Sequence, residues 1–134
     1  MSGFVERAMA LRAQKEPHIN CAQAVALPFG EAAGADGETL MRLAAGFGGG
    51  MRSGSVCGAY TGGVMALGLY DLGDPETLRL FRERFTEKSG GMTDCRDLLR
   101  CGVEHGLEKK AHCDGLVISA VTVVEELLSE KGKI

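Results

Sequence analysis

The sequence predicts an all-α protein, built as a compact helical bundle of about six to seven helices with a glycine-rich loop leading into a central helix. Apolar residues recur at helical spacing along most of the 134 residues. No segment alternates apolar and polar residues for long enough to predict a strand. The length is that of one domain, so we expect residues 1–134 to fold as a single unit.

Two helices are expected in the first quarter of the chain. Residues 3–15 are amphipathic, and Asn20 is a good N-cap for a second helix that begins at Cys21. Pro28 lacks the N–H group that an interior helical residue donates. The second helix should therefore be kinked or broken at Pro28 before it ends near Ala33.

The middle of the chain combines a short helix, a glycine-rich loop and two longer helices. The short helix is expected over residues 39–46, and the segment GFGGGMRSGS that follows is typical of a loop. Helical spacing resumes over residues 57–72. Asp74 followed by proline is a helix start signal, and the helix that begins there should stop at Gly90.

The last part of the chain predicts two more helices. The first covers residues 93–100, with Cys95 facing the interior and Cys101 at its end. The charged segment EHGLEKKAH should form a loop or irregular turn. The final helix is expected over residues 113–131, which places Cys113 in its first turn.

Composition excludes several classes of function. The net charge of −3 and the absence of a basic stripe argue against a nucleic-acid partner. The N-terminus lacks the apolar core of a signal peptide, and the least polar run is too rich in glycine, serine and threonine to favour membrane insertion. We therefore expect a cytoplasmic protein, whose five cysteines stay unpaired in a reducing compartment.

Cys57, in the segment GSVCGAYTGG, is the first candidate for a reactive thiol. It stands where a glycine-rich loop becomes a helix, and free N–H groups at a helix start favour a thiolate. Gly54, Gly58 and Gly62 recur every four residues and would let a second backbone approach, either of this chain or of a second copy in a homo-oligomer. The alternative is that Cys57 is a small buried hydrophobe and the glycines serve packing alone.

The other cysteines extend the candidate site. Cys21, Cys95 and Cys113 are each predicted in or next to the first turn of a helix, as Cys57 is, and helix starts favour anions. No C-x-x-C pair is present, so neither a zinc ribbon nor a thioredoxin motif is indicated. The neighbouring histidines, His18 and His112, suit a metal shell, thiol tuning or plain capping. Four separate buried cysteines remain the simpler alternative.

Together the segments NCAQAV, GFGGGMRSGSVCGAYTGGVMALGL and DCRDLL, followed by a cysteine near the start of the final helix, carry a family resemblance. The chain resembles the redox-active C-GCAxxG-C-C family of small bacterial and archaeal proteins over about residues 18–128. The resemblance implies redox activity and assigns the four family cysteines to Cys21, Cys57, Cys95 and Cys113. Cys101 is left without a role, and no C-x-x-C-H haem attachment motif occurs.

Three functions are consistent with these residues. In the first, Cys57 is the attacking thiolate of a thiol–disulfide redox protein, resolved by Cys21, Cys95 or Cys113 and served by an unidentified redox partner. In the second, the same four cysteines are metal ligands that bind an iron–sulfur cluster or a zinc ion. In the third, the chain is a structural or interaction domain whose cysteines only pack.

Overall fold

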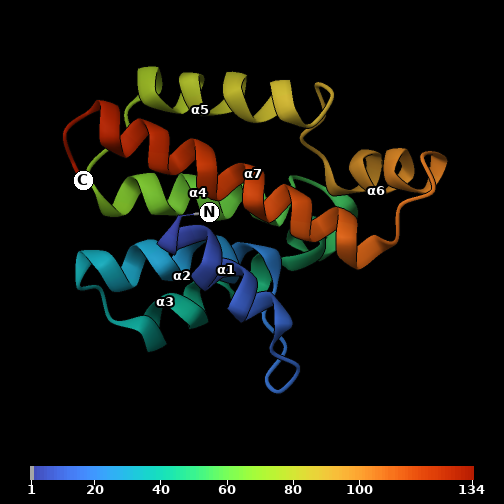
Figure 1. Cartoon of the computed structure of the whole chain (residues 1–134), viewed down its shortest axis with the longest axis horizontal. Helices are drawn as coiled ribbons and strands as arrows, with labels where there is room; N and C mark the ends of the chain where they lie inside the picture. The colour runs from blue at the N-terminus through green and yellow to red at the C-terminus, as the bar shows by residue number, and fades with distance from the viewer. Residues whose placement is uncertain (1) are drawn as a thin grey trace.

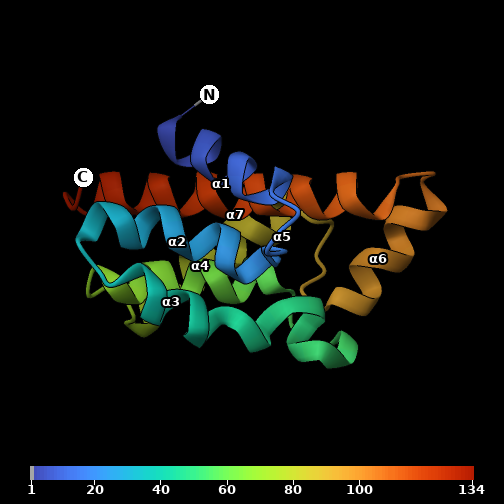
Figure 2. The same cartoon turned by 90° about the horizontal axis from the view of Figure 1, so that it is seen from below.

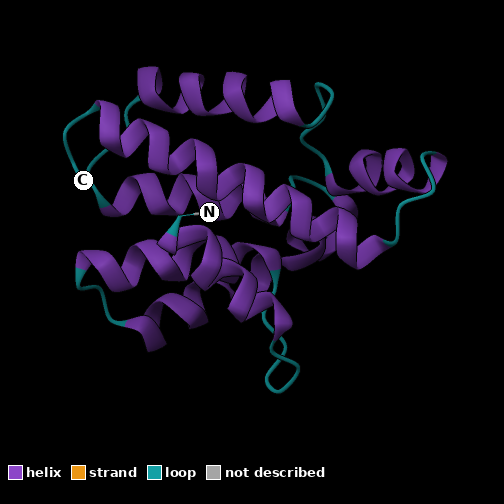
Figure 3. Cartoon of the chain, in the orientation of Figure 1, coloured by secondary structure: helices purple, strands orange, loops and turns teal. Residues whose placement is uncertain are grey.

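The structure is a computed structural model that describes residues 2–134, and it confirms the all-α class (Figure 3). Seven α-helices account for most of this range, and two short helical turns lie between the third and the fourth. The helices are α1 (Gly3–Ala13), α2 (Cys21–Ala33), α3 (Gly37–Ala44), α4 (Gly58–Leu69), α5 (Pro75–Lys88), α6 (Cys95–Glu104) and α7 (Lys109–Glu130); the turns are Ala45–Phe47 and Gly50–Gly54.

The long C-terminal helix α7 is the centre of the bundle. It contacts α1, α2, α4 and α5 along its length, while α6 touches only its N-terminal part and projects at one end of the molecule (Figures 1 and 2). The buried side of α7 includes Val117, Val121 and Val124, whose side chains are fully inaccessible. Within residues 2–134, none of the helices combines the length and the apolar character needed to cross a membrane.

Helix α2 begins as predicted but continues further than predicted. The Asn20 side chain accepts a hydrogen bond from the Gln23 N–H (2.8 Å), and Gln23 returns one to the Asn20 N–H (2.9 Å), which completes a capping box. Of the predicted kink or break at Pro28, the break is wrong, because the helix runs through this residue to Ala33. Pro28 and its neighbours on both sides are buried, so tertiary packing outweighs the one lost hydrogen bond.

The glycines of α4 serve contacts within the chain. A Cβ atom on Gly62 would lie 2.6 Å from the Ala22 carbonyl oxygen of α2, and one on Gly63 would collide with the Phe81 ring of α5. The side of α4 that carries Gly58 and Gly62 is therefore covered by α2, and these two helices have the most extensive contact among the described helices. The expectation of a homo-oligomer through this helix stays a prediction.

The glycine-rich segment before α4 has a defined shape. Four consecutive residues, Gly49 to Arg52, take left-handed backbone angles, and the Ser55 N–H closes the turn on the Gly50 carbonyl oxygen at 2.9 Å. A Cβ atom on Gly50 would lie 2.5 Å from the Ser55 oxygen and 2.7 Å from the Cys95 Cβ atom, so only glycine fits there.

The boundary between the last two helices differs from the prediction. Helix α6 runs to Glu104 and includes Cys101, and α7 begins at Lys109, so only residues 105–108 of the predicted loop connect the two helices. Gly106 ends α6 in a Schellman motif, in which the Leu107 N–H bonds to the Gly102 carbonyl oxygen at 2.8 Å. The lysines and alanine that follow are good helix formers and extend α7 by one turn.

Candidate functional site

All four family cysteines line one cavity of about 480 Å³. It lies at the end of the bundle where α2, α4 and α6 begin, beside the first turns of α7. Cys21 is the first residue of α2, Cys95 is the first residue of α6, and Cys57 is the N-cap of α4. The fold thus brings together four thiols that no local spacing connects.

Cys113 does not occupy the predicted helix start. Because α7 begins at Lys109, Cys113 is its fifth residue and lies in the second turn. It reaches the cavity because it lies on the face of α7 that meets α1 and α2. Its electrostatic environment therefore comes from neighbouring side chains rather than from the end of its own helix.

Cys21 and Cys113 form a contacting pair. A hydrogen bond between their side chains lowers the pKa of Cys113 and raises that of Cys21, while burial raises the pKa of both. The cation of Arg12 favours the thiolate form at either position, and Lys109 adds to this at Cys113. The pair therefore shares its first negative charge, which settles on Cys113 with Cys21 as the hydrogen-bond donor.

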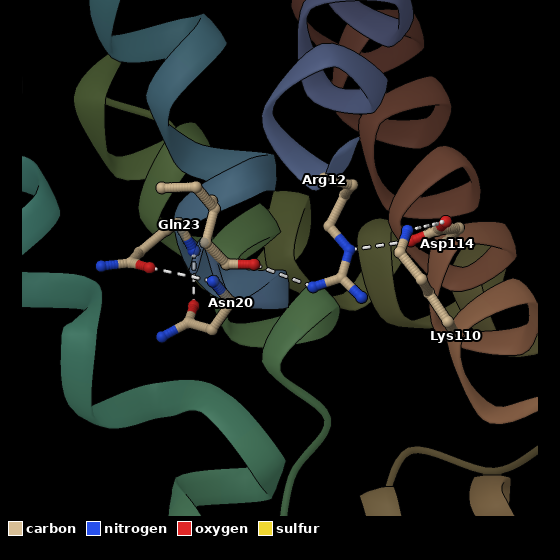
Figure 4. Close-up of polar contacts among 6 residues, drawn as sticks. Arg12, Asn20, Gln23, Lys110 and Asp114 are labelled. Atoms are coloured by element: carbon tan, nitrogen blue, oxygen red, sulfur yellow. Dashed lines mark hydrogen bonds and ion pairs between the residues drawn. The ribbon is translucent and has the colours of Figure 1, made fainter. Parts of the chain in front are cut away.

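Arg12 is the buried cation of the site (Figure 4). Its side chain is only 8% exposed; Nε donates to the Asp114 carboxylate at 2.8 Å, and Nη1 donates to the Ile19 carbonyl oxygen at 2.9 Å. Lys110 donates to the other oxygen of Asp114 at 3.0 Å. Partial burial opposes ionisation of Asp114, but the hydrogen bonds from the two cations hold its pKa below the usual value. This network joins α1 to α7 beside the Cys21–Cys113 pair.

An isolated β-bridge between the residues before Cys57 and Cys95 holds these two cysteines near each other. Val56 and Asp94 form an antiparallel bridge in which Cys57 N–H bonds to the Thr93 oxygen (2.7 Å) and Cys95 N–H bonds to the Ser55 oxygen (2.6 Å). In such a bridge the two residues that follow the paired positions point to the same face. The bridge therefore directs both thiols toward the cavity.

The surroundings of Cys57 disfavour its thiolate. Cys57 is 4% exposed, and burial raises its pKa to about 11, although the backbone N–H groups of Tyr60 and Ala59 act in the opposite direction. Burial also raises the pKa of Cys95. The predicted effect of the helix start on Cys57 is therefore present but is outweighed by loss of solvent.

The remaining cysteine and the histidines lie outside the thiol cluster, with one exception. Cys101 does not line the cavity, and its neighbour His105 directs Nδ1 to the Cys101 carbonyl oxygen at 2.8 Å. His112 Nε2 donates a hydrogen bond to the Leu98 carbonyl oxygen at 2.8 Å, and the ring packs against Gly102. His18 alone lies at the cavity wall.

The predicted metal site is not preformed. Over residues 2–134, no three side chains among histidine, cysteine, aspartate and glutamate are placed to hold one metal ion. Cys21, Cys57, Cys95 and Cys113 share a cavity, but lining one cavity does not by itself make a tetrahedral ligand set. The zinc or iron–sulfur interpretation therefore stays a prediction.

Sequence reasoning missed the cations of the site. The amphipathic pattern of residues 3–15 does not single out Arg12, and the predicted loop EHGLEKKAH includes Lys109 and Lys110. The one signal available was the short connection between the first two helices, which brings the last turn of α1 back to the residues before Cys21. The local sequence pattern contains no signal that α1 packs against α7.

The fold and the site define an all-α protein in which five helices bring four thiols and a buried arginine to one cavity. Residues 19–127 match the family described as "Putative redox-active protein (C_GCAxxG_C_C)", and the chain belongs to that family. No curated protein and no solved structure matches the chain.

Proposed function

We propose that this protein is a thiol–disulfide redox protein whose reacting pair is Cys113 and Cys21. The observation that carries the proposal is that these two thiols line the same cavity as Arg12 and interact with each other beside its buried cation. A thiolate is the nucleophile in disulfide exchange, and a neighbouring cation and a thiol donor both stabilise it. The description of the family as redox-active supports the same class of function.

The exchange proceeds in two steps with a disulfide as the oxidant. The Cys113 thiolate attacks one sulfur of the substrate, the substrate S–S bond breaks, and a mixed disulfide forms as the first substrate thiolate leaves. Cys21 then releases its proton to solvent and attacks the Cys113 sulfur, which expels the second substrate thiolate. The protein gains the Cys21–Cys113 disulfide and loses two electrons, and the substrate becomes two thiols.

Cys57 and Cys95 are assigned no attacking role in this scheme. Their raised pKa values keep them protonated near neutral pH. The role of attacking thiol, expected for Cys57 from its position at a helix start, passes to Cys113. Both thiols still line the cavity and form part of its wall.

The first test is a thiol count with disulfide mapping. Fully reduced protein should titrate five thiols, and mild oxidation by a small disulfide should remove two of them. Peptide mapping should find the new bond between Cys21 and Cys113. Cys101→Ser should titrate one thiol fewer but lose the same two. An unchanged count after oxidation, or protein purified anaerobically with bound zinc or iron and few free thiols, would contradict the proposal.

The second test is the pH dependence of thiol alkylation by neutral iodoacetamide. The rate follows the thiolate fraction and rises with pH, so a lowered pKa at Cys113 places the midpoint of this rise below the ordinary value of 9.0. Arg12→Gln removes the cation and should move the midpoint to higher pH, which slows alkylation at pH 7 by about three- to tenfold.

The matched control for this test is Arg84→Gln. Arg84 also joins α7 through a carboxylate, Glu130, at 2.6 Å, but it lies away from the cavity. This variant should keep the wild-type midpoint. Equal profiles for wild type and Arg12→Gln would show that Arg12 does not act on the thiol pair.

A further inference from the structure

The cavity over the thiols is locally positive in an acidic protein. The whole chain has a net charge of −3. The cavity wall nevertheless includes four cationic side chains and no aspartate or glutamate. The cations are Arg12, Lys15, Lys109 and Lys110. Such a concentration of one charge in a concave site attracts ligands of the opposite sign.

Most of this positive charge is not neutralised by the protein. Asp114 is the carboxylate that serves both Arg12 and Lys110. Among residues 2–134, Lys15 and Lys109 take part in no ion pair. Two of the four cations therefore remain available to a ligand, and the other two share one counter-charge.

Arg12 can also contact a ligand directly. Its Nε and Nη1 atoms have partners in the protein, whereas Nη2 has no hydrogen bond within the described residues. No side-chain nitrogen or oxygen in this part of the chain is both fully buried and without a partner. Nη2 therefore keeps some accessible surface, on a side chain that lines the cavity beside the Cys21–Cys113 pair.

The rest of the cavity wall suits the apolar body of a small molecule. Ala13, Leu98, Leu99 and Leu116 line it, and a volume of about 480 Å³ is in the range of small-ligand sites. Of these lining residues, Lys15 and Lys109 are exposed, whereas the four cysteines are buried or partly buried. A ligand that satisfies both regions is anionic at its ends and apolar in the middle.

We propose that the substrate of this site is a small disulfide that carries carboxylates, held by Lys15, Lys109 and Arg12 with its sulfur atoms over the Cys21–Cys113 pair. This inference rests on the proposed thiol–disulfide function and adds the chemical class of the substrate. The chemistry of exchange is unchanged: the substrate S–S bond breaks, two carboxylate-bearing thiols leave, and the protein disulfide forms.

A matched series of disulfides tests the charge preference. 3,3′-Dithiodipropionate, 2-hydroxyethyl disulfide and cystamine have two-carbon arms that end in a carboxylate, a hydroxyl and an ammonium group. Each rate of protein oxidation is divided by the rate of the same disulfide with a small neutral thiol, which removes intrinsic reactivity. We expect the normalised rate to be about tenfold or more higher for the dicarboxylate than for cystamine at low ionic strength, and the ratio to fall with added salt.

A lysine double variant separates recognition from thiol chemistry. Lys15→Gln/Lys109→Gln should lower the dicarboxylate-to-cystamine ratio several-fold. A loss of rate shared by all three disulfides would come from the thiolate, whereas a change in the ratio comes from recognition. Lys131→Gln/Lys133→Gln removes two lysines that do not line the cavity and should keep the ratio.

A binding experiment tests the inference without disulfide exchange. Suberate, 1,6-hexanediol and 1,6-diaminohexane have the same end groups, with two methylenes in place of the sulfur atoms. Suberate should protect the reactive thiol of the wild-type protein from neutral iodoacetamide, and the other two should not.

The outcomes distinguish the two proposals. Protection by suberate without reaction of any disulfide would refute the thiol–disulfide function and leave an anion site. Equal normalised rates for the three disulfides, together with no protection by suberate, would refute the anionic substrate and leave the redox function. A higher normalised rate for cystamine than for the dicarboxylate would also refute the anionic substrate.

Discussion

Cys113→Ala is expected to slow the reaction of the protein with a disulfide at pH 7 by more than about tenfold. The cavity thiols that remain all have raised pKa values: that of Cys57 is about 11, and those of Cys95 and Cys21 are also raised. The pKa of Cys113 is about 7, so that of Cys57 is about four units higher. This leaves roughly 5000-fold less thiolate at pH 7, of which the greater nucleophilicity of the Cys57 thiolate recovers at most about 100-fold. Single-turnover kinetics with excess 2-hydroxyethyl disulfide measure the effect.

Three companion variants define the roles in this reaction. Cys21→Ala should still be attacked at Cys113 but should stop at the mixed disulfide, which mass spectrometry detects. Cys57→Ala should keep the fast phase, because its thiol is protonated at pH 7. Cys101→Ala is the matched control outside the cavity. If Cys57→Ala removes the fast phase and Cys113→Ala keeps it, the helix-start thiol is the nucleophile, as the sequence alone suggests.

Gly62→Ala is expected to lower the free energy of unfolding by about 2 to 3 kcal/mol, the upper part of the range for overpacked cores. The added Cβ atom would lie 2.6 Å from the Ala22 carbonyl oxygen and 3.0 Å from the Ala22 Cα atom. Both contacts are with backbone, so α2 and α4 would have to move apart rather than turn a side chain. Urea unfolding followed by far-UV circular dichroism measures the change.

Gly68→Ala is the matched control for this prediction. Gly68 belongs to the same helix, but a Cβ atom there has no heavy atom within 4 Å. Alanine should therefore stabilise the protein slightly, by up to about 1 kcal/mol, through its better helix propensity. Equal stability of Gly62→Ala and Gly68→Ala would show that the α2–α4 contact tolerates a methyl group.

Most of the fold could be predicted from local sequence signals. Asn20 and Asp74 each cap a helix at the predicted residue, and Pro75 occupies the first position of α5. These signals act through neighbouring backbone groups, so they need no knowledge of tertiary structure. The same is true of the helical spacing of the apolar residues in the last helix, which are buried in the structure.

The errors in the fold prediction arose where tertiary packing decides. Pro28 lies inside a helix that is buried around it, and packing there outweighs the proline penalty. The charge of the segment before Cys113 predicts a loop. In the structure this segment forms the first turn of α7, and the Lys110–Asp114 ion pair stabilises it. As a result, Cys113 lies inside α7 and not at its start, where the sequence places it.

The candidate site was predictable in its members but not in its arrangement. Family motifs identified Cys21, Cys57, Cys95 and Cys113, and the structure shows that they share a cavity. Which thiols contact each other depends on the packing of α2 against α7 and on the Val56–Asp94 bridge. These are contacts between distant parts of the chain, and helical periodicity contains no information about them.

The ion pair between Arg12 and Asp114 joins the first helix to the last, next to two cysteines that stand near opposite ends of the chain. A bond between Cys21 and Cys113 would close a loop that contains most of the residues. Closing a loop of this size in the unfolded chain stabilises the folded state by about 4 to 5 kcal/mol. Oxidation and folding of this protein are therefore thermodynamically linked: whatever favours the native bundle also favours the oxidised pair.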